Sequence, residues 1–273
     1  MNTDMTVGEA PDDAAIAALL GQDRRWGAYA LCDLEPPYRA NARYIGAWRD
    51  GGLAMGDRRA GGLVALALVY RFLNAAVLSF SGADDGVRAI LAGISDLPPT
   101  PFLMVCDADL PALAARYRLE DIWMMRRMVV RVGASPPRRP APDGVTLRPL
   151  TRADVPALLT LYRGETVTVS PSPDNGPLYG AFLDGELVAA AGTHAVSARH
   201  GVGIVGGVYT SPARRGRGLA TATTGAVVAA LADAGAREVA LNVRADNAPA
   251  LAAYTRLGFT PHVDFWEGDA RLR

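Results

Sequence analysis

Hydrophobic and polar positions in the second half of the chain follow two different periods. Between residues 178 and 196, two alternating runs flank Asp184 and Gly185, a dipeptide that favours a tight turn, so a β-hairpin is predicted. The segment "EVALNVR" (238–244) alternates again and predicts a strand. Residues 218–234 instead predict a helix with one buried face, because apolar or small side chains recur there every four positions: Leu219, Thr223, Val227 and Leu231.

Glycine and proline mark where the neighbouring elements begin and end. "GVGIVGGVYT" (201–210) predicts a strand with a bulge, since Gly206 and Gly207 lie in its interior. A helix is predicted after residue 247, with Pro249 in its first turn and Gly258 just past its end. A strand over 145–148, a helix that begins near 151–154 and a last strand near Phe265 complete the order. This order predicts an α/β fold with a mixed β-sheet flanked by helices.

A segment rich in proline and glycine, "GASPPRRPAPDG" (133–144), interrupts the chain near its middle. Such a composition is typical of a semi-rigid linker. The chain has 273 residues, of which 50% are hydrophobic, and this suffices for two cores. We therefore predict two domains, 1–132 and 145–273, joined by a linker over 133–144.

Composition narrows the classes of partner. The formal net charge is zero, which argues against nucleic acid, and the longest apolar run, 63–70, is too short for a membrane span of about 20 residues. Cys32 and Cys106 are far apart, and no secretory signal begins the sequence, so we expect a reducing, cytoplasmic location. The scattered histidines and cysteines predict no metal site. We expect neither nucleic acid nor membrane as a partner and leave a homodimer open.

The stretch "SPARRGRGLA" (211–220) lies between a predicted strand and a predicted helix. Unpaired backbone N–H groups at the start of a helix, glycines that allow close approach and arginines together suit a phosphate group. The stretch lacks the Gly-Lys-Ser/Thr of a mononucleotide loop and the glycine spacing of a dinucleotide fingerprint. A solvated basic turn is the alternative interpretation.

The stretch fits the pattern Gln/Arg-x-x-Gly-x-Gly/Ala, and "LNVRADNAPALAAYTRLGF" follows it with an Asn, a Tyr and a Gly-Phe pair. Over 145–266 the chain thereby resembles the GNAT superfamily of N-acetyltransferases. The resemblance implies two parallel strands that diverge around the pantetheine arm of acetyl-CoA, and a loop that holds its pyrophosphate. The implied cosubstrate-binding residues are Val208, Tyr209, Thr210, Arg215, Gly216, Arg217, Gly218, Leu219, Ala220, Thr221 and Asn247.

The resemblance also implies the chemistry, in which a neutral amine attacks a thioester and a thiolate leaves. Tyr254 matches the general acid of the family. The strand before the loop carries no glutamate, so the general base is open: His194 is the first candidate, and Glu267 or a chain of water molecules are others. We expect less of His200 and His262, because they lie in predicted loops.

The two halves also resemble each other. "VCDADLPALAARYRL" (105–119) and "VRADNAPALAAYTRL" (243–257) align at an offset of 138, with the prolines in register, and indicate an internal duplication. In the first half Asp109 stands where the second has Asn247, and Arg116 where it has Tyr254. Asp84 and Asp85 at the equivalent of the loop disfavour a pyrophosphate. We therefore expect a degenerate GNAT-like first domain without CoA binding.

The sequence thus predicts transfer of an acetyl group from acetyl-CoA to the amine of a small molecule, in a ternary complex. Acceptors on proteins or peptides are an alternative, and an acyl-CoA-binding sensor or assembly module without turnover is another. Residues 24–48 are rich in aromatic and acidic side chains and could line an acceptor pocket or form core: Tyr29, Asp33, Glu35, Tyr38 and Tyr44.

Overall fold

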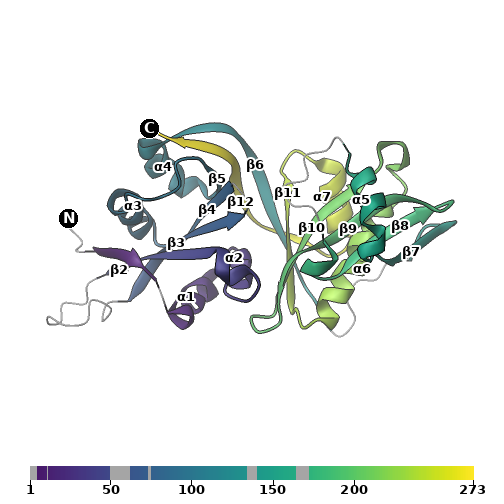
Figure 1. Cartoon of the computed structure of the whole chain (residues 1–273), viewed down its shortest axis with the longest axis horizontal. Coiled ribbons are helices and arrows are strands. Elements are labelled where there is room, and N and C mark those ends of the chain that lie inside the picture. Colours follow the sequence, from purple (N-terminus) through teal and green to yellow (C-terminus); the bar gives the residue numbers. More distant parts are fainter. Residues whose placement is uncertain (1–4, 11, 50–61, 73–74, 134–139, 164–171) are drawn as a thin grey trace. The chain divides into compact units, whose positions relative to one another are not determined.

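A computed structural model describes residues 5–10, 12–49, 62–72, 75–133, 140–163 and 172–273. The chain divides into two compact units, Met1–Met125 together with Val263–Arg273, and Arg126–His262. Both termini belong to the first unit (Figure 1). These units differ from the halves expected from the linker, because two long strands, β6 (Tyr117–Arg131) and β12 (Thr260–Leu272), each pass from one unit into the other.

The first unit is a mixed sheet with helices on it. Its strands lie in the order β1-β2-β3-β4-β5-β12, in which β1 to β4 are antiparallel, β4 and β5 are parallel, and β5 and β12 are antiparallel. The strands are β1 (Met5–Glu9), β2 (Ala42–Arg49), β3 (Leu63–Phe72), β4 (Ala75–Gly82) and β5 (Pro101–Val105). The helices are α1 (Asp13–Leu20), α2 (Ala28–Cys32), α3 (Asp84–Gly93) and α4 (Leu110–Arg116).

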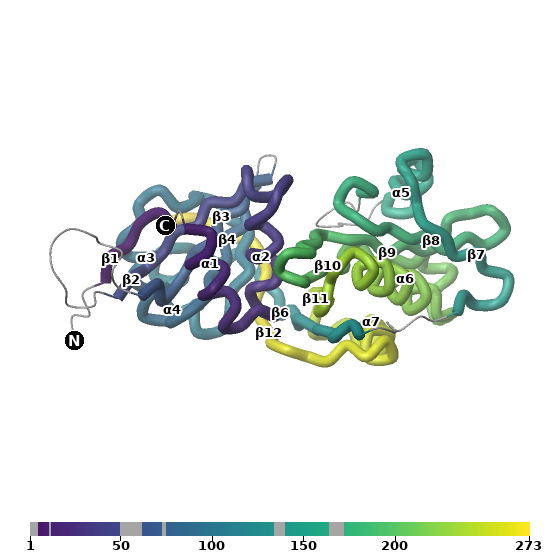
Figure 2. The backbone as a smooth tube through the Cα atoms, turned by 90° about the horizontal axis from the view of Figure 1, so that it is seen from below, coloured from purple at the N-terminus to yellow at the C-terminus, as the bar shows by residue number. Residues whose placement is uncertain are grey.

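The second unit repeats this plan. Its strands lie in the order β7-β8-β9-β10-β11-β6, antiparallel from β7 to β10, with β10 parallel to β11. The strands are β7 (Val145–Pro149), β8 (Leu178–Leu183), β9 (Glu186–Ser197), β10 (Val202–Thr210) and β11 (Glu238–Arg244). The helices are α5 (Val155–Leu161), α6 (Leu219–Asp233) and α7 (Ala248–Arg256), traced in Figure 2.

The last strand of each unit comes from the other half of the sequence. The strand predicted near Phe265 is β12, but most of it belongs to the first unit, where Trp266 pairs with Val105 of β5. In the second unit the end of β6 takes the equivalent place beside β11, where the N–H of Val132 donates to the carbonyl of Arg237 (2.9 Å). Nothing in the periodicity of a single segment encodes such an exchange of strands.

Local predictions in the second unit are confirmed. Asp184 and Gly185 form the hairpin turn with positive φ angles of 52° and 81°. The four side chains that recur every four residues along α6 are all buried. Ala189 of β9 packs with Leu219 of α6, whereas Ala190 packs with Leu158 of α5. Since successive strand residues point to opposite faces, α5 and α6 cover opposite faces of the sheet.

Two further findings concern membrane-spanning helices and the cysteines. Among the described residues, no helix has the length and apolar character needed to cross a membrane. Cys32 is buried, Cys106 is half-buried, and both are free thiols. Burial raises the pKa of the Cys32 thiol, so this cysteine stays protonated within the core.

Candidate functional site

The parallel strands β10 and β11 diverge towards their carboxyl ends. They pair over only three positions, from Val202 opposite Glu238 to Ile204 opposite Ala240. Strand β10 then continues for six residues to Thr210, and β11 continues to Arg244, without pairing to each other. The gap in the hydrogen-bond ladder leaves peptide groups of β10 available on that side, as a ligand inserted between two strands requires.

The glycines in β10 form the predicted bulge. The register of β10 against β9 shifts between Gly206 and Tyr209, and Gly207 has a positive φ of 58°, which only glycine adopts without strain. The carbonyl oxygen of Gly207 accepts a hydrogen bond from the hydroxyl of Tyr162, a buried residue that directly follows α5. Val208 therefore lies in a stretch of backbone that pairs with neither neighbouring strand.

The loop between β10 and α6 is exposed and shaped by two glycines. Gly216 and Gly218 have φ angles of 77° and 76°, and both residues are exposed. No described side chain caps α6, and its first internal hydrogen bond runs from the N–H of Ala222 to the carbonyl of Gly218 (3.0 Å). The N–H groups of Leu219, Ala220 and Thr221 therefore lie free at the positive end of a 15-residue helix, which suits an anion.

Two groups at the end of β10 are notable. The guanidinium of Arg215 folds back: its Nε donates to the carbonyl of Thr210 (3.2 Å), and it lies 5.9 Å from the centre of the Tyr209 ring. The hydroxyl oxygen of Thr210 is buried and has no hydrogen-bond partner among the described residues. Such an orphaned polar atom is costly unless a ligand or water satisfies it. Arg217 is exposed beside the same turn.

Helix α7 carries both residues of the second predicted motif. Asn247 is exposed at the helix start, where its Oδ1 accepts a hydrogen bond from the N–H of Ala250 (3.2 Å), so it is a helix cap whose amide N–H groups remain available. Tyr254 is 6% exposed, and its ring lies 6.0 Å from that of Phe259. Its hydroxyl forms no hydrogen bond with any described residue, and burial raises its pKa, so the phenol stays protonated.

His194 lies at a second bulge, in β9. Ile204 pairs with Ala195 and the next residue of β10 pairs with Thr193, so His194 is the extra residue. Its side chain lies over Gly206, where a Cβ atom would approach within 3.2 Å of the histidine Cβ. Burial, and secondly the charge of Arg127, lowers the pKa of His194 from 6.5 to about 4. The imidazole is therefore neutral at pH 7.

The remaining base candidates are dispersed. Glu267 lies on β12 in the first unit, opposite Met104 of β5. His200 follows the end of β9, where its N–H donates to Ser197 Oγ (3.0 Å), and His262 lies at the start of β12. In the first unit, the position equivalent to Tyr254 is taken by Arg116, which donates to the carbonyls of Leu91 and Ser95 and offers no comparable neutral acid.

The structure adds two residues that sequence reasoning missed. Tyr162 holds the carbonyl of the bulge, and Arg127 is a fully buried arginine whose Nε donates to Asn242 Oδ1 on β11 (3.0 Å). A signal for Arg127 existed, since Arg126 and Arg127 interrupt the otherwise apolar stretch "WMMRRMVV" (123–130). Its proximity to His194 could not be read from the sequence, because β6 reaches β11 only through the strand exchange.

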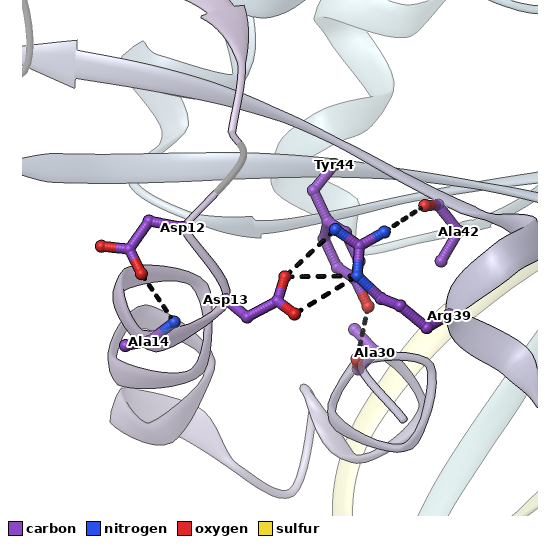
Figure 3. Close-up of polar contacts among 7 residues, drawn as sticks. All are labelled: Asp12, Asp13, Ala14, Ala30, Arg39, Ala42 and Tyr44. Carbon is purple, nitrogen blue, oxygen red and sulfur yellow. Dashed lines mark hydrogen bonds and ion pairs between the residues drawn. The ribbon is translucent and has the colours of Figure 1, made fainter. Parts of the chain in front are cut away.

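The aromatic and acidic segment of the first unit is partly structural (Figure 3). The hydroxyl of buried Tyr44 donates to the carbonyl of Ala30 (2.6 Å), and Arg39 lies over its ring while pairing with Asp13 (3.1 Å). Asp33 differs from Tyr44 and Arg39, because its side chain forms no hydrogen bond with any described residue. Burial raises its pKa from 3.8 to about 8. In the described part of the chain, no three His, Cys, Asp or Glu residues are arranged to hold a metal ion.

Sequence comparisons agree with this geometry. Residues 151–259 match the Acetyltransferase (GNAT) family. Mycothiol acetyltransferase of Nocardioides sp. is 34% identical over 216 residues, which are 65% of this chain and 71% of that protein. Mycothiol acetyltransferase of Catenulispora acidiphila is 36% identical over 55% of this chain and 54% of its own length, so that match spans about half of the relative.

Solved structures show the same fold over almost the whole chain. A GCN5-related N-acetyltransferase from Sphaerobacter thermophilus aligns with a TM-score of 0.64 at 18% identity, over 98% of this chain and 95% of that one. A tandem GNAT protein from the clavulanic acid biosynthesis pathway aligns with a TM-score of 0.56 at 14% identity, over 98% of both chains. The protein therefore consists of two GNAT-like units and belongs to the GNAT family of acetyltransferases.

Proposed function

We propose that the second unit binds acetyl-CoA where β10 and β11 diverge, and that it transfers the acetyl group to the amine of a small molecule by direct attack in a ternary complex. The observation that carries this proposal is the end of β10–β11 pairing at Ile204, followed by an exposed glycine turn at an uncapped helix start. Acetyl-CoA supplies the acetyl group as a reactive thioester.

The residues of this region suit each part of the cosubstrate. Peptide groups around Val208 and Thr210 would hydrogen-bond the amides of the pantetheine arm, and the buried Thr210 hydroxyl would gain a partner. The free N–H groups from Leu219 to Thr221 would hold the pyrophosphate. Arg217 is exposed and suits a further phosphate, whereas Arg215 orders the turn through Thr210.

Tyr254 would donate the proton that the leaving thiolate requires. A proton donor must remain protonated at the working pH, and its hydroxyl must not already donate a hydrogen bond to another group. The raised pKa of Tyr254 and the lack of a hydrogen bond from its hydroxyl among described residues meet both conditions. Asn247 would contact the CoA arm through the amide N–H groups that capping leaves available.

His194 would accept the proton from the amine, either directly or through water. The imidazole is neutral at pH 7, which is the form that accepts a proton. A conjugate acid with a pKa near 4 holds that proton only briefly, so we propose that His194 passes it on rather than storing it. Strand β10 offers no acidic side chain for this task.

The acceptor class rests on a different argument. The curated relatives are named mycothiol acetyltransferase, and we propose that this chain takes the amine of a small molecule. An amine on a protein or peptide is the alternative within the same chemistry. The absence of a carboxylate on β10 favours a second candidate of another class, an acyl-CoA-binding sensor, and the free hydroxyl of Tyr254 argues against it.

The binding step is tested by calorimetric titration of acetyl-CoA into Ala220→Glu and Ala220→Gln. A glutamate in the first turn stabilises a helix and repels a pyrophosphate, so the Glu variant should fold normally and bind at least tenfold more weakly. The Gln variant has the same shape without the charge and should bind as the parent protein does. Equal binding by all three proteins would show that α6 does not hold the cosubstrate.

The transfer step is tested by thiol release from acetyl-CoA with a panel of primary amines and with short peptides. Release with a small amine that Tyr254→Phe slows, while acetyl-CoA still binds, supports the proposed enzyme. Release with peptides alone would move the acceptor to the protein class. Binding without release in any mixture would favour the sensor.

A further inference from the structure

The first unit contains a cavity of about 580 Å³ in the place equivalent to the proposed acetyl-CoA site of the second unit. It lies beside the end of β4, the start of α3 and the turn after β5, and α1 and the segment after it close another side. In the second unit the corresponding elements are β10, α6 and β11. A volume of this size is typical of small-molecule sites.

The likeness between the two places extends to single residues. At the offset of 138 found in the sequence, Asp109 of the first unit corresponds to Asn247 of the second, and Asp109 lines the cavity. The indole N–H of Trp26 donates to the carbonyl of Phe80 at the end of β4 (2.6 Å), as the Tyr162 hydroxyl does to Gly207 in β10. The cavity therefore occupies the place in the first unit that corresponds to the proposed acetyl-CoA site of the second.

Charge distinguishes the two copies. Among the described residues, the cavity is lined by the carboxyl groups of Asp23, Asp84 and Asp109 and by no arginine or histidine. Asp84 occupies the first turn of α3, where the second unit offers free N–H groups to an anion. A pyrophosphate would meet like charges on several sides, so this copy cannot hold acetyl-CoA in the manner proposed for the other.

Asp109 supplies the observation that points to a ligand. It is 7% exposed, and one carboxylate oxygen, Oδ2, accepts a hydrogen bond from the N–H of Cys106 (3.0 Å). No described residue forms a hydrogen bond with the other oxygen. The second oxygen of this buried carboxylate therefore has room for a positively charged or hydrogen-donating partner in the cavity that it borders.

We propose that this cavity binds a small molecule that carries an ammonium group on an apolar body. Asp109 and Asp84 would hold the ammonium, while Leu20, Trp26 and Val87 would contact the apolar part. A metal ion fits less well, because the described residues contain no cluster of three suitable ligands. The proposal concerns the first unit alone and stands independently of acetyl transfer by the second.

Binding should depend on pH through Asp109. Burial raises the pKa of Asp109 from 3.8 to about 6. The hydrogen bond from the N–H of Cys106 lowers this pKa, and the negative charge of Asp84 raises it further. The other titratable groups that line the cavity are Asp23, Asp84 and the Cys106 thiol. As the pH rises from 5 to 7, Asp109 goes from about one-tenth to about nine-tenths ionised, so the affinity for an ammonium should rise nearly tenfold.

The test uses the full chain with phenethylammonium as the probe and 2-phenylethanol as its uncharged analogue, both titrated by calorimetry. The Trp26 indole N–H resonance, assigned through Trp26→Phe, reports binding at the cavity itself. We expect one phenethylammonium per chain and weaker binding of the alcohol. Asp109→Asn should reduce the affinity for the ammonium by about 10-fold to 100-fold.

Two variants keep the result interpretable. Asp85→Asn removes the same charge at the residue next to Asp84. The Asp85 side chain pairs with Arg49 (2.6 Å) and does not line the cavity, so this variant should bind phenethylammonium as the parent protein does. Asp84→Asn alters an exposed residue, so it should fold even if Asp109→Asn does not, and it should weaken binding in the same direction.

Three results would overturn the proposal. One is equal binding of phenethylammonium and 2-phenylethanol. Another is phenethylammonium binding that is unchanged in Asp84→Asn and Asp109→Asn but lost in Tyr254→Phe. This result would place the amine in the second unit. The third is binding of two acetyl-CoA molecules per chain, one of which shifts the Trp26 indole N–H resonance.

Discussion

Replacing Asp33 by asparagine should stabilise the first unit, and the gain should grow with pH. Asp33 follows α2, has no side-chain hydrogen bond to any described residue, and is half-buried. Burial raises its pKa from 3.8 to about 8, since the charged form is deprived of water and receives no compensating partner. Asparagine keeps the shape of the side chain and removes the ionisation.

The sign and size follow from proton linkage. Between pH 4 and pH 8 the unfolded chain has lost the Asp33 proton while the folded protein retains it, so the folded state becomes less stable as the pH rises. Each pH unit in this window lowers the free energy of unfolding by about 1.4 kcal/mol. The advantage of Asp33→Asn should therefore be near zero at pH 4 and reach roughly 4 kcal/mol at pH 7, a large part of the stability of an ordinary domain.

The assay is urea unfolding at a series of pH values, followed by tryptophan fluorescence. All four tryptophans, Trp26, Trp48, Trp123 and Trp266, belong to the first unit, so the signal reports this unit alone. Asp96→Asn is the control: Arg43 lowers the pKa of this exposed carboxylate, so its removal should not produce a gain that rises with pH. A difference between Asp33→Asn and the parent that is constant across pH would refute the reasoning.

Three predictions concern the second unit. Tyr254→Phe should lower kcat by about 10²-fold or more without weakening acetyl-CoA binding, measured by thiol release and calorimetry. The pKa of His194, followed through its imidazole resonances, should rise from about 4 in Arg127→Gln, because a neighbouring positive charge is removed. Tyr162→Phe should destabilise the protein by about 1 kcal/mol and weaken acetyl-CoA binding, since the carbonyl of Gly207 loses its donor.

The elements that the sequence predicted well are those whose causes are local. Asp184 and Gly185 adopt the positive φ angles that a two-residue hairpin requires, and Asn247 caps a helix that has proline in its first turn. The bulge at Gly206 and Gly207 was predictable for the same reason, because a glycine pair interrupts an otherwise β-prone run. These features depend on the conformational preferences of a few adjacent residues.

The features that escaped prediction depend on contacts between distant segments. The partner of Gly207 is Tyr162, 45 residues earlier, and the charge beside His194 comes from Arg127 on a strand that crosses from the other unit. The pKa of His194 follows from burial first and from the charge of Arg127 second, so its residue type indicated only that it could titrate. The low value turns a candidate base into one that is neutral at every physiological pH.

The two units share a scaffold but differ in the charge of a few side chains. Both units keep the strand order and a parallel pair, β4 with β5 and β10 with β11. Both also have an aromatic side chain that donates a hydrogen bond to a carbonyl of the first strand of that pair, Trp26 to Phe80 in one unit and Tyr162 to Gly207 in the other. What differs is charge: the second unit has the neutral amide of Asn247 at the start of α7, and the first unit has the carboxylate of Asp109 at the corresponding position. The two proposed sites imply that a few acidic side chains suffice to change the preferred ligand from an anion to an ammonium group, because like charges repel, while the fold stays the same.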